Sequence, residues 1–374
     1  MPGLLPNVDP DGLLEYSVVY TDRAVNHMSV SFQTVMTDIS RTLGQVYNAE
    51  AVTIVPGSGT YGMEAVARQF ATDQHVLVIR NGWFSYRWTQ IFEAGSIPAS
   101  HTVLKARSSG ASQAPFSPAP IDEVVAAIEA EKPSVVFAPH VETSAGMMLP
   151  TDYLSAVAEA THAVGGIFVL DCIASGTIWV DMAATGVDVL VSAPQKGWSG
   201  PPCAGLVMLS AAGVERLEAT TSSSFSCDLR KWREIMAAYE TGGHAYHATM
   251  PTDALTVFRN VMQETEAFGF DAVAAAQADL GARVRALLES RGFTSVAAAG
   301  FQAPGVVVSY TDAADIKTGK RFADAGLQVA GGVPLMVDEP DDFSTFRIGL
   351  FGLDKIGHID RTVASLEAAL DSFT

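Results

Sequence analysis

Between about residue 50 and residue 210, short apolar runs alternate with segments that have the periodicity of amphipathic helices. Each apolar run has the length of one buried strand, and the segments between them are long enough for helices. Alternation of this kind predicts a mostly parallel sheet covered by helices on both faces. Strands are expected at Ala51–Val55, His75–Arg80, Ser134–Ala138, Gly166–Asp171, Val187–Ala193 and Gly205–Ser210, with helices that include Tyr61–Phe70, Ile121–Glu131 and Asp152–Val164.

The pattern changes after residue 250. A long helical pattern covers Pro251–Arg291, and after it come two apolar runs, Gly305–Tyr310 and Thr345–Phe351, with the helical segments Ala313–Ala325 and Lys355–Ser372. This arrangement predicts a small α+β domain, and a chain of 374 residues is long enough for two domains. We expect an N-terminal arm (residues 1–20), a large domain (21–254), and a linking helix with a small C-terminal domain (255–374).

Composition narrows the class of protein. Hydrophobic residues make up 48% of the chain and charged residues 17%, as in a well-packed globule, and no apolar run reaches the ~20 residues of a membrane helix. The net charge of −18 repels nucleic acid and anionic lipid, so we expect neither as a partner. The N-terminal residues lack the pattern of a secretory signal. The three cysteines are odd in number and lack zinc-site spacing, which is typical of reduced thiols in a reducing compartment. Both features favour a cytoplasmic protein.

The first candidate for chemistry is the turn Gly57-Ser-Gly59-Thr-Tyr-Gly62, which lies between a predicted strand and a predicted helix. Such turns bind a phosphate through backbone N–H groups at the start of the helix. A dinucleotide site would also need an acidic residue at the end of the next strand, where this chain has Arg80 and Asn81. An arginine there suits NADP, so a dehydrogenase stays open at this point. Ser58 and Thr60 add hydroxyl groups to the turn.

Two charged residues follow later strands. Asp171 ends the run Gly166–Asp171, and Lys196 comes shortly after Val187–Ala193. Ligands bind beyond the carboxyl ends of parallel strands, so both side chains are expected at one site. Pyridoxal 5'-phosphate (PLP) needs this pair, because a lysine binds its aldehyde as a Schiff base and a carboxylate keeps its pyridine ring cationic. Alone, such an aspartate is typical of a helix cap and such a lysine of the surface. Together with the phosphate-binding turn they indicate a PLP enzyme.

These residues resemble those of the class V, fold-type I aminotransferases, close to the alanine–glyoxylate and serine–glyoxylate group, from about residue 25 to the end. The resemblance implies an α/β fold with a seven-stranded, mostly parallel sheet and a small C-terminal domain. The motifs that carry it are Gly57–Glu64, Asn81-Gly-Trp-Phe-Ser-Tyr-Arg87, His140-Val-Glu-Thr-Ser-Ala-Gly146, Ser192–Lys196, Tyr246–Pro251 and Thr345-Phe-Arg-Ile-Gly349.

The resemblance also implies roles for single residues. Phe84 is expected to stack on the cofactor ring, Ser144 to bond its phenolic oxygen, and Gln195 to reach its phosphate. Tyr246 and Thr249 are expected to reach the phosphate bound by the other subunit of a homodimer with shared active sites. The cofactor site as a whole is expected to consist of Ser58, Gly59, Thr60, Phe84, Ser144, Asp171, Ile173, Gln195, Lys196, Tyr246 and Thr249.

Substrate contacts are expected from a third group. The resemblance implies that Arg347 grips the substrate carboxylate, since a guanidinium group matches a carboxylate with two hydrogen bonds. Family members often begin with a Gly-Pro-Gly-like segment that touches substrate, but this chain has Tyr16-Ser-Val-Val-Tyr20 in that place. Phe84 replaces the stacking tryptophan of many members, with Trp83 beside it. Asn26 and His27 are expected to bind substrate, and the candidates for shaping the pocket are Tyr20, Asn26, His27, Trp83, Tyr86 and Trp198.

The sequence thus predicts a transaminase that moves an amino group from a small amino acid, such as alanine or serine, to glyoxylate or pyruvate. Lys196 is expected to carry the proton from the substrate Cα, because the amine is within reach of both reacting carbons. An aminoalkylphosphonate–pyruvate transaminase is the alternative within the family. A PLP lyase or desulfurase would need a nucleophilic cysteine after Cys227, which the chain lacks. An NADP-dependent dehydrogenase and a binding protein without a cofactor complete the alternatives.

Overall fold

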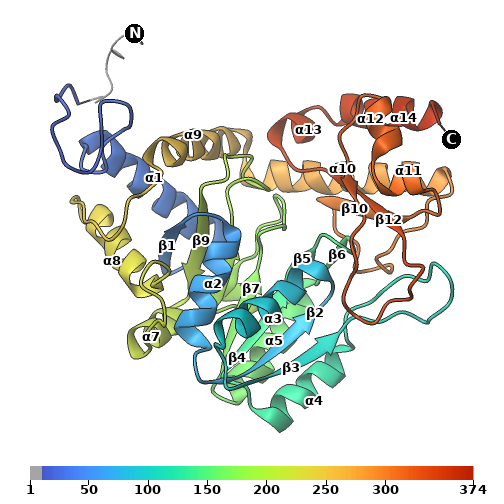
Figure 1. Ribbon diagram of the computed structural model, residues 1–374, viewed down its shortest axis with the longest axis horizontal. Coiled ribbons are helices and arrows are strands. Elements are labelled where there is room, and N and C mark those ends of the chain that lie inside the picture. The colour runs from blue at the N-terminus through green and yellow to red at the C-terminus, as the bar shows by residue number, and fades with distance from the viewer. Residues whose placement is uncertain (1–10, 374) are drawn as a thin grey trace.

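The computed structural model describes residues 11–373, and its largest feature is a seven-stranded sheet (Figure 1). Four of the six pairs of neighbouring strands are parallel, and one strand, β9, is antiparallel to both of its neighbours. The prediction of a mostly parallel sheet is therefore confirmed. In sheet order the strands are β1 (Ala51–Pro56), β9 (Ala204–Leu209), β8 (Val189–Ser192), β7 (Ile167–Asp171), β4 (Val135–Pro139), β2 (His75–Arg80) and β3 (Ser100–Lys105).

Burial explains why these segments are strands. The central strands β7, β8, β9 and β4 are buried at every position, as expected for a parallel sheet with both faces covered. Strand β3 differs because it forms the edge of the sheet and none of its residues is fully buried. Its apolar run is correspondingly weak, which is why the sequence pattern did not predict it.

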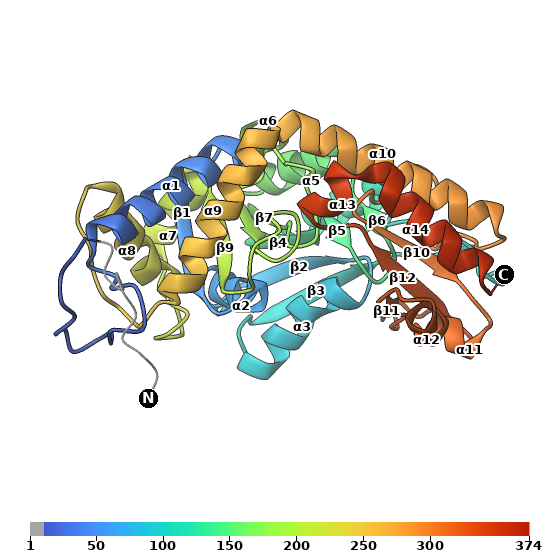
Figure 2. The same ribbon diagram turned by 90° about the horizontal axis from the view of Figure 1, so that it is seen from above.

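Helices cover both faces of the sheet. Helices α2 and α3 lie on one side and α5 lies on the other, with α4 packed against α5 (Figure 2). Helices α1 and α8 pack together beside β1. The helices of this region are α1 (Val30–Tyr47), α2 (Gly59–Phe70), α3 (Trp83–Gly95), α4 (Ile121–Glu131), α5 (Thr151–Ala163), α6 (Met182–Thr185), α7 (Ala211–Ala219) and α8 (Leu229–Glu240).

Strand register brings the predicted site residues to one edge of the sheet. Asp171, the last residue of β7, pairs with Pro139 of β4 on one side and with Val191 of β8 on the other. The carboxyl end of β1 lies at the same edge, because β9 joins it antiparallel to β8. A short hairpin, β5 (Val141–Glu142) and β6 (Met147–Met148), follows β4 there.

The long helical pattern after residue 250 forms two helices rather than one. Helix α9 (Thr252–Phe268) ends at Gly269, and α10 (Phe270–Ser290) begins directly after it. Gly269 has a φ of 98°, a backbone conformation that cannot continue a helix and that favours glycine. The expectation of a single linking helix is therefore wrong at this residue.

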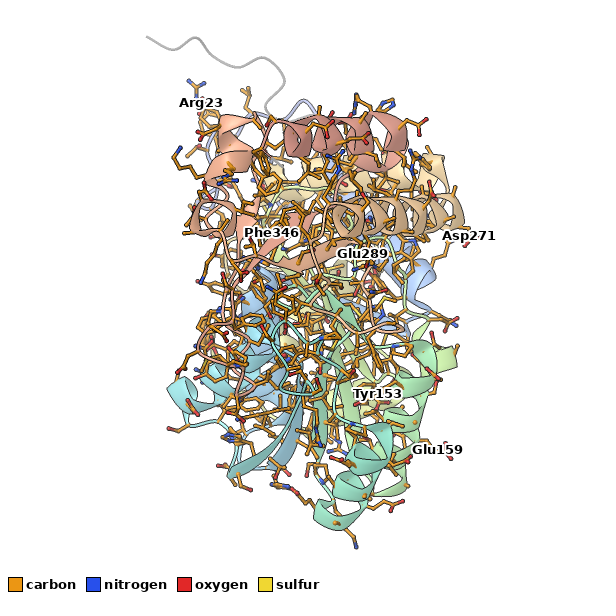
Figure 3. The ribbon with its side chains drawn as sticks, turned by 90° about the vertical axis from the view of Figure 1, so that its right-hand side faces the viewer. Arg23, Tyr153, Glu159, Asp271, Glu289 and Phe346 are labelled. Atoms are coloured by element: carbon orange, nitrogen blue, oxygen red, sulfur yellow. The ribbon has the colours of Figure 1, made fainter. Side chains whose placement is uncertain are left out.

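A second, three-stranded antiparallel sheet lies beyond α10, in the order β10-β12-β11. Its core includes Phe346, which contacts the rings of Phe293 and Phe322, while Asp271 lies at the surface (Figure 3). The elements are β10 (Val306–Tyr310), α11 (Ala314–Lys317), α12 (Lys320–Asp324), β11 (Ala330–Gly331), β12 (Thr345–Gly349), α13 (Leu353–Gly357) and α14 (Ile359–Asp371).

We retain the border between residues 254 and 255 as a proposal. The seven-stranded sheet lies wholly before it and the three-stranded sheet wholly after it. Residues 1–10 of the expected N-terminal arm lie outside the described residues. Across residues 11–373, no helix has the length and apolar character needed to cross a membrane.

Candidate active site

The turn after β1 has the geometry of a phosphate-binding turn. Its first amide, Gly57 N–H, donates to the Cys203 carbonyl, and α2 begins two residues later. The N-cap residue Ser58 makes no side-chain bond to the helix, so its hydroxyl is not used for capping. A Cβ at Gly59 would lie 2.6 Å from Ile173 Cδ1, so a larger residue at this position would require the Ile173 side chain to shift. Gly62 in turn packs directly on the backbone of β9.

Asp171 lies beside this turn at the end of β7. Its Oδ1 accepts a hydrogen bond of 2.9 Å from Ile173 N–H, and its side chain is buried. Burial is the main reason that the pKa of Asp171 rises to about 7, and the nearby carboxylate of Glu142 adds to the shift. A carboxyl group in this setting ionises fully only when a cationic partner is close to it.

Lys196 lies in the loop after β8, and the loop is held firmly. Gly200 N–H donates to the Pro194 carbonyl, and the buried ring of Trp198 packs against Trp179 with the two ring centroids 4.7 Å apart. Burial lowers the pKa of Lys196, and the guanidinium groups of Arg347 and Arg87 lower it further, while Asp171 opposes the shift. The amine therefore has more of its neutral, nucleophilic form than an exposed lysine.

One cavity of about 200 Å³ joins these three features. It contains eight of the residues predicted for the cofactor site, including Gln195, whose buried Oε1 has no hydrogen-bond partner in the protein. An unpaired buried amide oxygen is typical of a site completed by a ligand. The lining residues are Ser58, Gly59, Thr60, Met63, Phe84, Arg87, Val141, Thr143, Asp171, Ile173, Ala174, Gln195 and Lys196.

Two cations lie near the ring of Phe84. The guanidinium carbon of Arg87 lies 5.4 Å from the ring centroid, and that of Arg347 lies 5.6 Å from it. Arg347 comes from β12 of the second sheet, where its Nε donates to the Gly331 carbonyl. Arg347 is not in the wall of the cavity but adjoins it through Phe84. Arg87 was not among the predicted site residues, although it is three residues after Phe84 and such residues share a helix face.

Ser144 is not placed as the resemblance implied. Its hydroxyl donates to Glu142 Oε1 at 2.6 Å and accepts from Trp83 N–H at 2.9 Å, and its side chain is fully buried. It does not line the cavity, whereas its neighbour Thr143 does. Thr143 is therefore the better candidate for the contact that the resemblance implied for Ser144, and the contact itself stays a prediction. The sequence motif contains both hydroxyls and cannot tell which one points inward.

Glu142 is a further residue whose role the sequence did not reveal. Its carboxylate accepts from the backbone N–H groups of Phe84, Ser85 and Ser144. The N–H groups of Phe84 and Ser85 belong to the first turn of α3, so they have no partner within the helix. A negative charge at this end also interacts favourably with the helix dipole. Glu142 thus fixes the beginning of α3 and with it the position of Phe84.

The remaining predicted residues form a separate cluster. The His27 ring lies 5.7 Å from both His244 and Tyr246, and Tyr246 and Thr249 share a hydrogen bond of 3.1 Å. Asn26 donates to Glu15 and Ser17 of the N-terminal segment rather than to the cavity. None of the four predicted residues in this cluster lines the cavity of Lys196.

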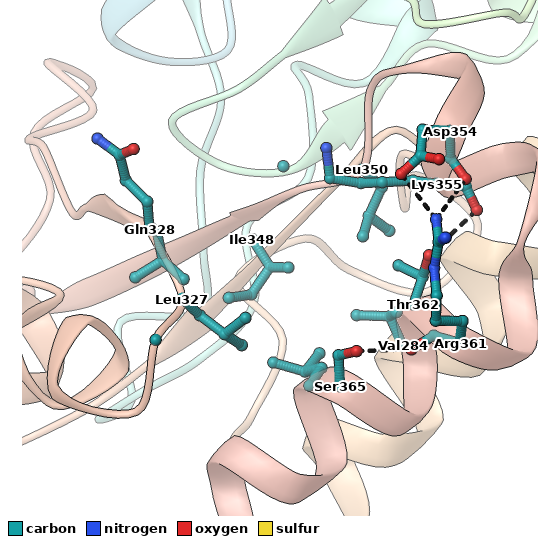
Figure 4. Close-up of a pocket in the computed structure, with 14 residues that line it drawn as sticks. Val284, Leu327, Gln328, Ile348, Leu350, Asp354, Lys355, Arg361, Thr362 and Ser365 are labelled. Carbon is teal, nitrogen blue, oxygen red and sulfur yellow. Dashed lines mark hydrogen bonds and ion pairs between the residues drawn. The ribbon is translucent and has the colours of Figure 1, made fainter.

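A larger hollow, of about 350 Å³, lies on the small-domain side between α10, α14 and β12 (Figure 4). Its walls are mainly apolar, and its charged groups already have partners. Arg361 pairs with Asp354 at 2.7 Å, and Lys355 donates to the Phe351 carbonyl. It contains no group prepared for chemistry, so the cavity of Lys196 is the candidate active site.

Comparison with known proteins gives consistent results. A family model described as aminotransferase class-V matches residues 12–333. The chain is similar to a 2-aminoethylphosphonate–pyruvate transaminase of Paraburkholderia phymatum, with 29% identity over 356 residues that cover 93% of this chain and 89% of the relative. Among solved structures it is similar to an alanine–glyoxylate aminotransferase from Nostoc sp., with a TM-score of 0.78, 22% identity and coverage of 92% and 89%. A ureidoglycine–glyoxylate aminotransferase from Bacillus subtilis has a TM-score of 0.77, 20% identity and coverage of 96% and 88%.

Proposed function

The chain belongs to the class-V aminotransferase family, and from this we propose that Lys196 and Asp171 are the catalytic pair of a transaminase acting on a small 2-oxo acid. It is accordingly an enzyme that depends on pyridoxal 5'-phosphate. One observation carries the proposal: an amine, a carboxyl group and a phosphate-binding turn from three different strand ends line one cavity.

The cavity fits this cofactor. Asp171 would hold the pyridine nitrogen, Ser58 and Gln195 the phosphate, and Phe84 and Ile173 the two faces of the ring. The hydroxyl of Thr143 takes the place that the sequence gave to Ser144, namely the contact with the phenolic oxygen. When bound, PLP supplies a cationic ring that withdraws electrons from the substrate Cα. The unpaired Oε1 of Gln195 and the raised pKa of Asp171 are both expected of a site that a polar, cationic ring completes.

Lys196 acts as the base. Its amine, with a lowered pKa, would accept the proton from the substrate Cα and deliver it to the aldehyde carbon (C4′) of the bound cofactor. The ring of Phe351, whose centroid lies 5.2 Å from Nζ, covers the amine from the small domain. With the cofactor bound, Asp171 would hold the ring nitrogen and, as a carboxylate, would preserve the positive charge of the ring.

Arg347 selects the substrates by charge. A guanidinium group binds a carboxylate or a phosphonate with two hydrogen bonds, and the acceptor is pyruvate or glyoxylate. The donor is a small amino acid such as alanine or serine. A 2-aminoethylphosphonate donor is the second candidate, and it is supported by the activity named for the curated relative at 29% identity.

The active enzyme is proposed to be a homodimer in the cytoplasm. The segment with Tyr246 and Thr249, together with Asn26 and His27, would complete the site of the partner subunit. Tyr246 is 55% exposed, and Phe225, whose ring contacts that of His247, is 79% exposed, as expected of side chains that a second copy covers. The apolar residues Leu14 and Tyr16 of the N-terminal segment are exposed in the same way.

The other enzyme classes fit less well. The family match excludes the dehydrogenase reading of the Gly57–Gly62 turn. A desulfurase would need a reactive thiol, but Cys172, Cys203 and Cys227 are all buried and burial raises the pKa of each.

A substrate screen tests the proposal. Alanine, serine and 2-aminoethylphosphonate would each be offered with pyruvate or glyoxylate, and the amino acid product measured. We expect turnover that depends on both partners and shows ping-pong kinetics. Transamination by none of these pairs in a PLP-loaded preparation would contradict the substrate class, and ammonia release from the donor alone would indicate a lyase.

A further inference from the structure

Arg87 lines the cavity, and its positive charge has no function in the proposed mechanism. It lies on α3, one turn after Phe84, and its Nη1 donates to Thr60 Oγ1 at 3.1 Å. Thr60 belongs to the phosphate-binding turn, so the guanidinium group is tied to the turn itself. Among the described residues, Arg87 forms no ion pair with a carboxylate, although those residues contain many such pairs.

The phosphate-binding turn needs a source of positive charge. A phosphate monoester carries close to two negative charges at neutral pH. The groups assigned to it, Ser58, Gly59, Thr60 and Gln195, are all uncharged. The start of α2 contributes roughly half a positive charge through its dipole, which leaves most of the phosphate charge unbalanced. In a chain with a net charge of −18, the surroundings do not supply the rest.

The two other cations near the site, Lys196 and Arg347, have other partners. Lys196 reacts with the aldehyde end of the cofactor and cannot stay a free ammonium group at the phosphate. Arg347 approaches Phe84 from the second sheet and is held there by its bond to the Gly331 carbonyl. Arg87 is therefore the one guanidinium group in the cavity wall, within residues 11–373, that is held by the turn.

We propose that Arg87 binds the phosphate group of PLP and supplies the charge that the turn lacks. The inference rests on the proposed cofactor site. The planar N–H groups of Arg87 match phosphate oxygens well, and one of them already donates a hydrogen bond to Thr60. The contact of Arg87 with the Phe84 ring keeps the guanidinium group at the cavity wall when the cofactor binds.

A second ligand with the same chemistry must be distinguished. A phosphonate or carboxylate at the far end of a substrate would also suit a guanidinium group. The bond to Thr60 favours the cofactor phosphate, because it ties Arg87 to the phosphate-binding turn, whereas Arg347 is bonded to Gly331 of the second sheet. The experiment separates the two by comparing ligands with and without the phosphate.

The test measures the affinity of the apoenzyme for PLP and for pyridoxal, which lacks the phosphate. Arg87→Gln should weaken PLP binding by about 10-fold to 100-fold, the scale of a lost hydrogen bond to a charged group, and should leave pyridoxal binding nearly unchanged. The PLP affinity of Arg87→Lys, which keeps the charge, should lie between that of the wild type and that of Arg87→Gln. Inorganic phosphate should compete with PLP for the wild-type apoenzyme, and this competition should be weaker in Arg87→Gln.

Arg347→Ala is the matched control, because it removes the other guanidinium group near the Phe84 ring. It should raise the KM for substrates and leave the affinity for PLP unchanged. Far-UV circular dichroism and the thermal midpoint of each apoenzyme show whether the variants fold.

Three results would overturn the inference. Equal loss of PLP and pyridoxal affinity would make Arg87 a structural residue, and unchanged PLP affinity with a raised KM would place it at the substrate. Failure of the wild-type protein to bind PLP would overturn the cofactor site itself, which the first two results leave intact.

Discussion

Burial changes the chemistry of single residues at this site, and Asp171 shows the effect most clearly. In an unfolded chain its carboxyl group loses its proton near pH 4, whereas in the folded protein its pKa is about 7. The folded apoenzyme therefore binds an extra proton between these values. Because stability falls with rising pH wherever the folded state binds more protons, Asp171 destabilises the apoenzyme progressively from about pH 4 to pH 7.

Replacement of Asp171 by Asn should remove this dependence. Between pH 5 and pH 8, the unfolding free energy of the Asn variant should rise relative to that of the wild-type apoenzyme by about 2 to 3 kcal/mol. Urea unfolding at both pH values measures the difference. The variant should also bind PLP weakly, because the ring nitrogen loses its anionic partner. Stability curves that run parallel from pH 5 to pH 8 would show that the carboxyl group titrates normally.

At the scale of elements, the position of Phe84 depends on a carboxylate from another element. Glu142 of β5 accepts the N–H groups of Phe84 and Ser85 at the start of α3. A neutral amide in its place keeps one acceptor oxygen but turns an NH₂ group toward N–H donors. The start of α3 would then lose bonds while staying buried.

We predict that Glu142→Gln lowers the unfolding free energy by about 1 to 3 kcal/mol, the cost of leaving buried polar groups unpaired. Thermal unfolding measures this, and PLP affinity should fall with it because Phe84 moves. Glu123→Gln is the matched control, since Glu123 forms an exposed ion pair with Arg107 and should lose less than about 1 kcal/mol. Equal stability of the two variants would show that Glu142 does not hold α3.

The sequence predicted the elements best where burial is complete. The six strands expected from apolar runs are all present, because both faces of those strands are covered. The exposed edge strand β3 and the break at Gly269 were not predicted. An edge strand has little apolar signal, and a glycine within a helical pattern reveals neither a positive φ nor the end of a helix.

At the scale of the whole molecule, the site joins segments that are far apart in the chain. The sequence identified Lys196, Asp171 and the phosphate-binding turn, because each follows a strand and strand ends meet at one edge. It could not place Arg347 beside Phe84, since that contact depends on how the second sheet packs on the first. It also could not separate Thr143, which lines the cavity, from Ser144, whose hydroxyl is bonded to Glu142.

Assembly gives a further prediction, because Tyr246 and Thr249 lie away from their own chain's cavity. If they serve the partner subunit, each dimer has two shared sites and a monomer has none. Mixing an inactive Lys196→Ala protein with an inactive Tyr246→Phe/Thr249→Ala double variant should then restore part of the activity. In the heterodimer both lesions fall in one site, and the other site is whole.

Subunit exchange must be shown separately, for example with two different affinity tags. Exchange without recovery of activity would mean that the segment serves its own chain. The apoenzyme should also dissociate more readily than the holoenzyme, because a ligand bound only by the dimer stabilises the dimer by mass action.

The central claim is that Lys196 is the residue that binds PLP, and one measurement tests it most directly. The purified protein, loaded with PLP, would be treated with borohydride, digested, and its peptides sequenced by mass spectrometry. The account predicts a visible absorption band that borohydride bleaches, with the reduced cofactor attached to Lys196 and no band in Lys196→Ala. Attachment to a different lysine, or a wild-type protein that takes up no PLP, would contradict it.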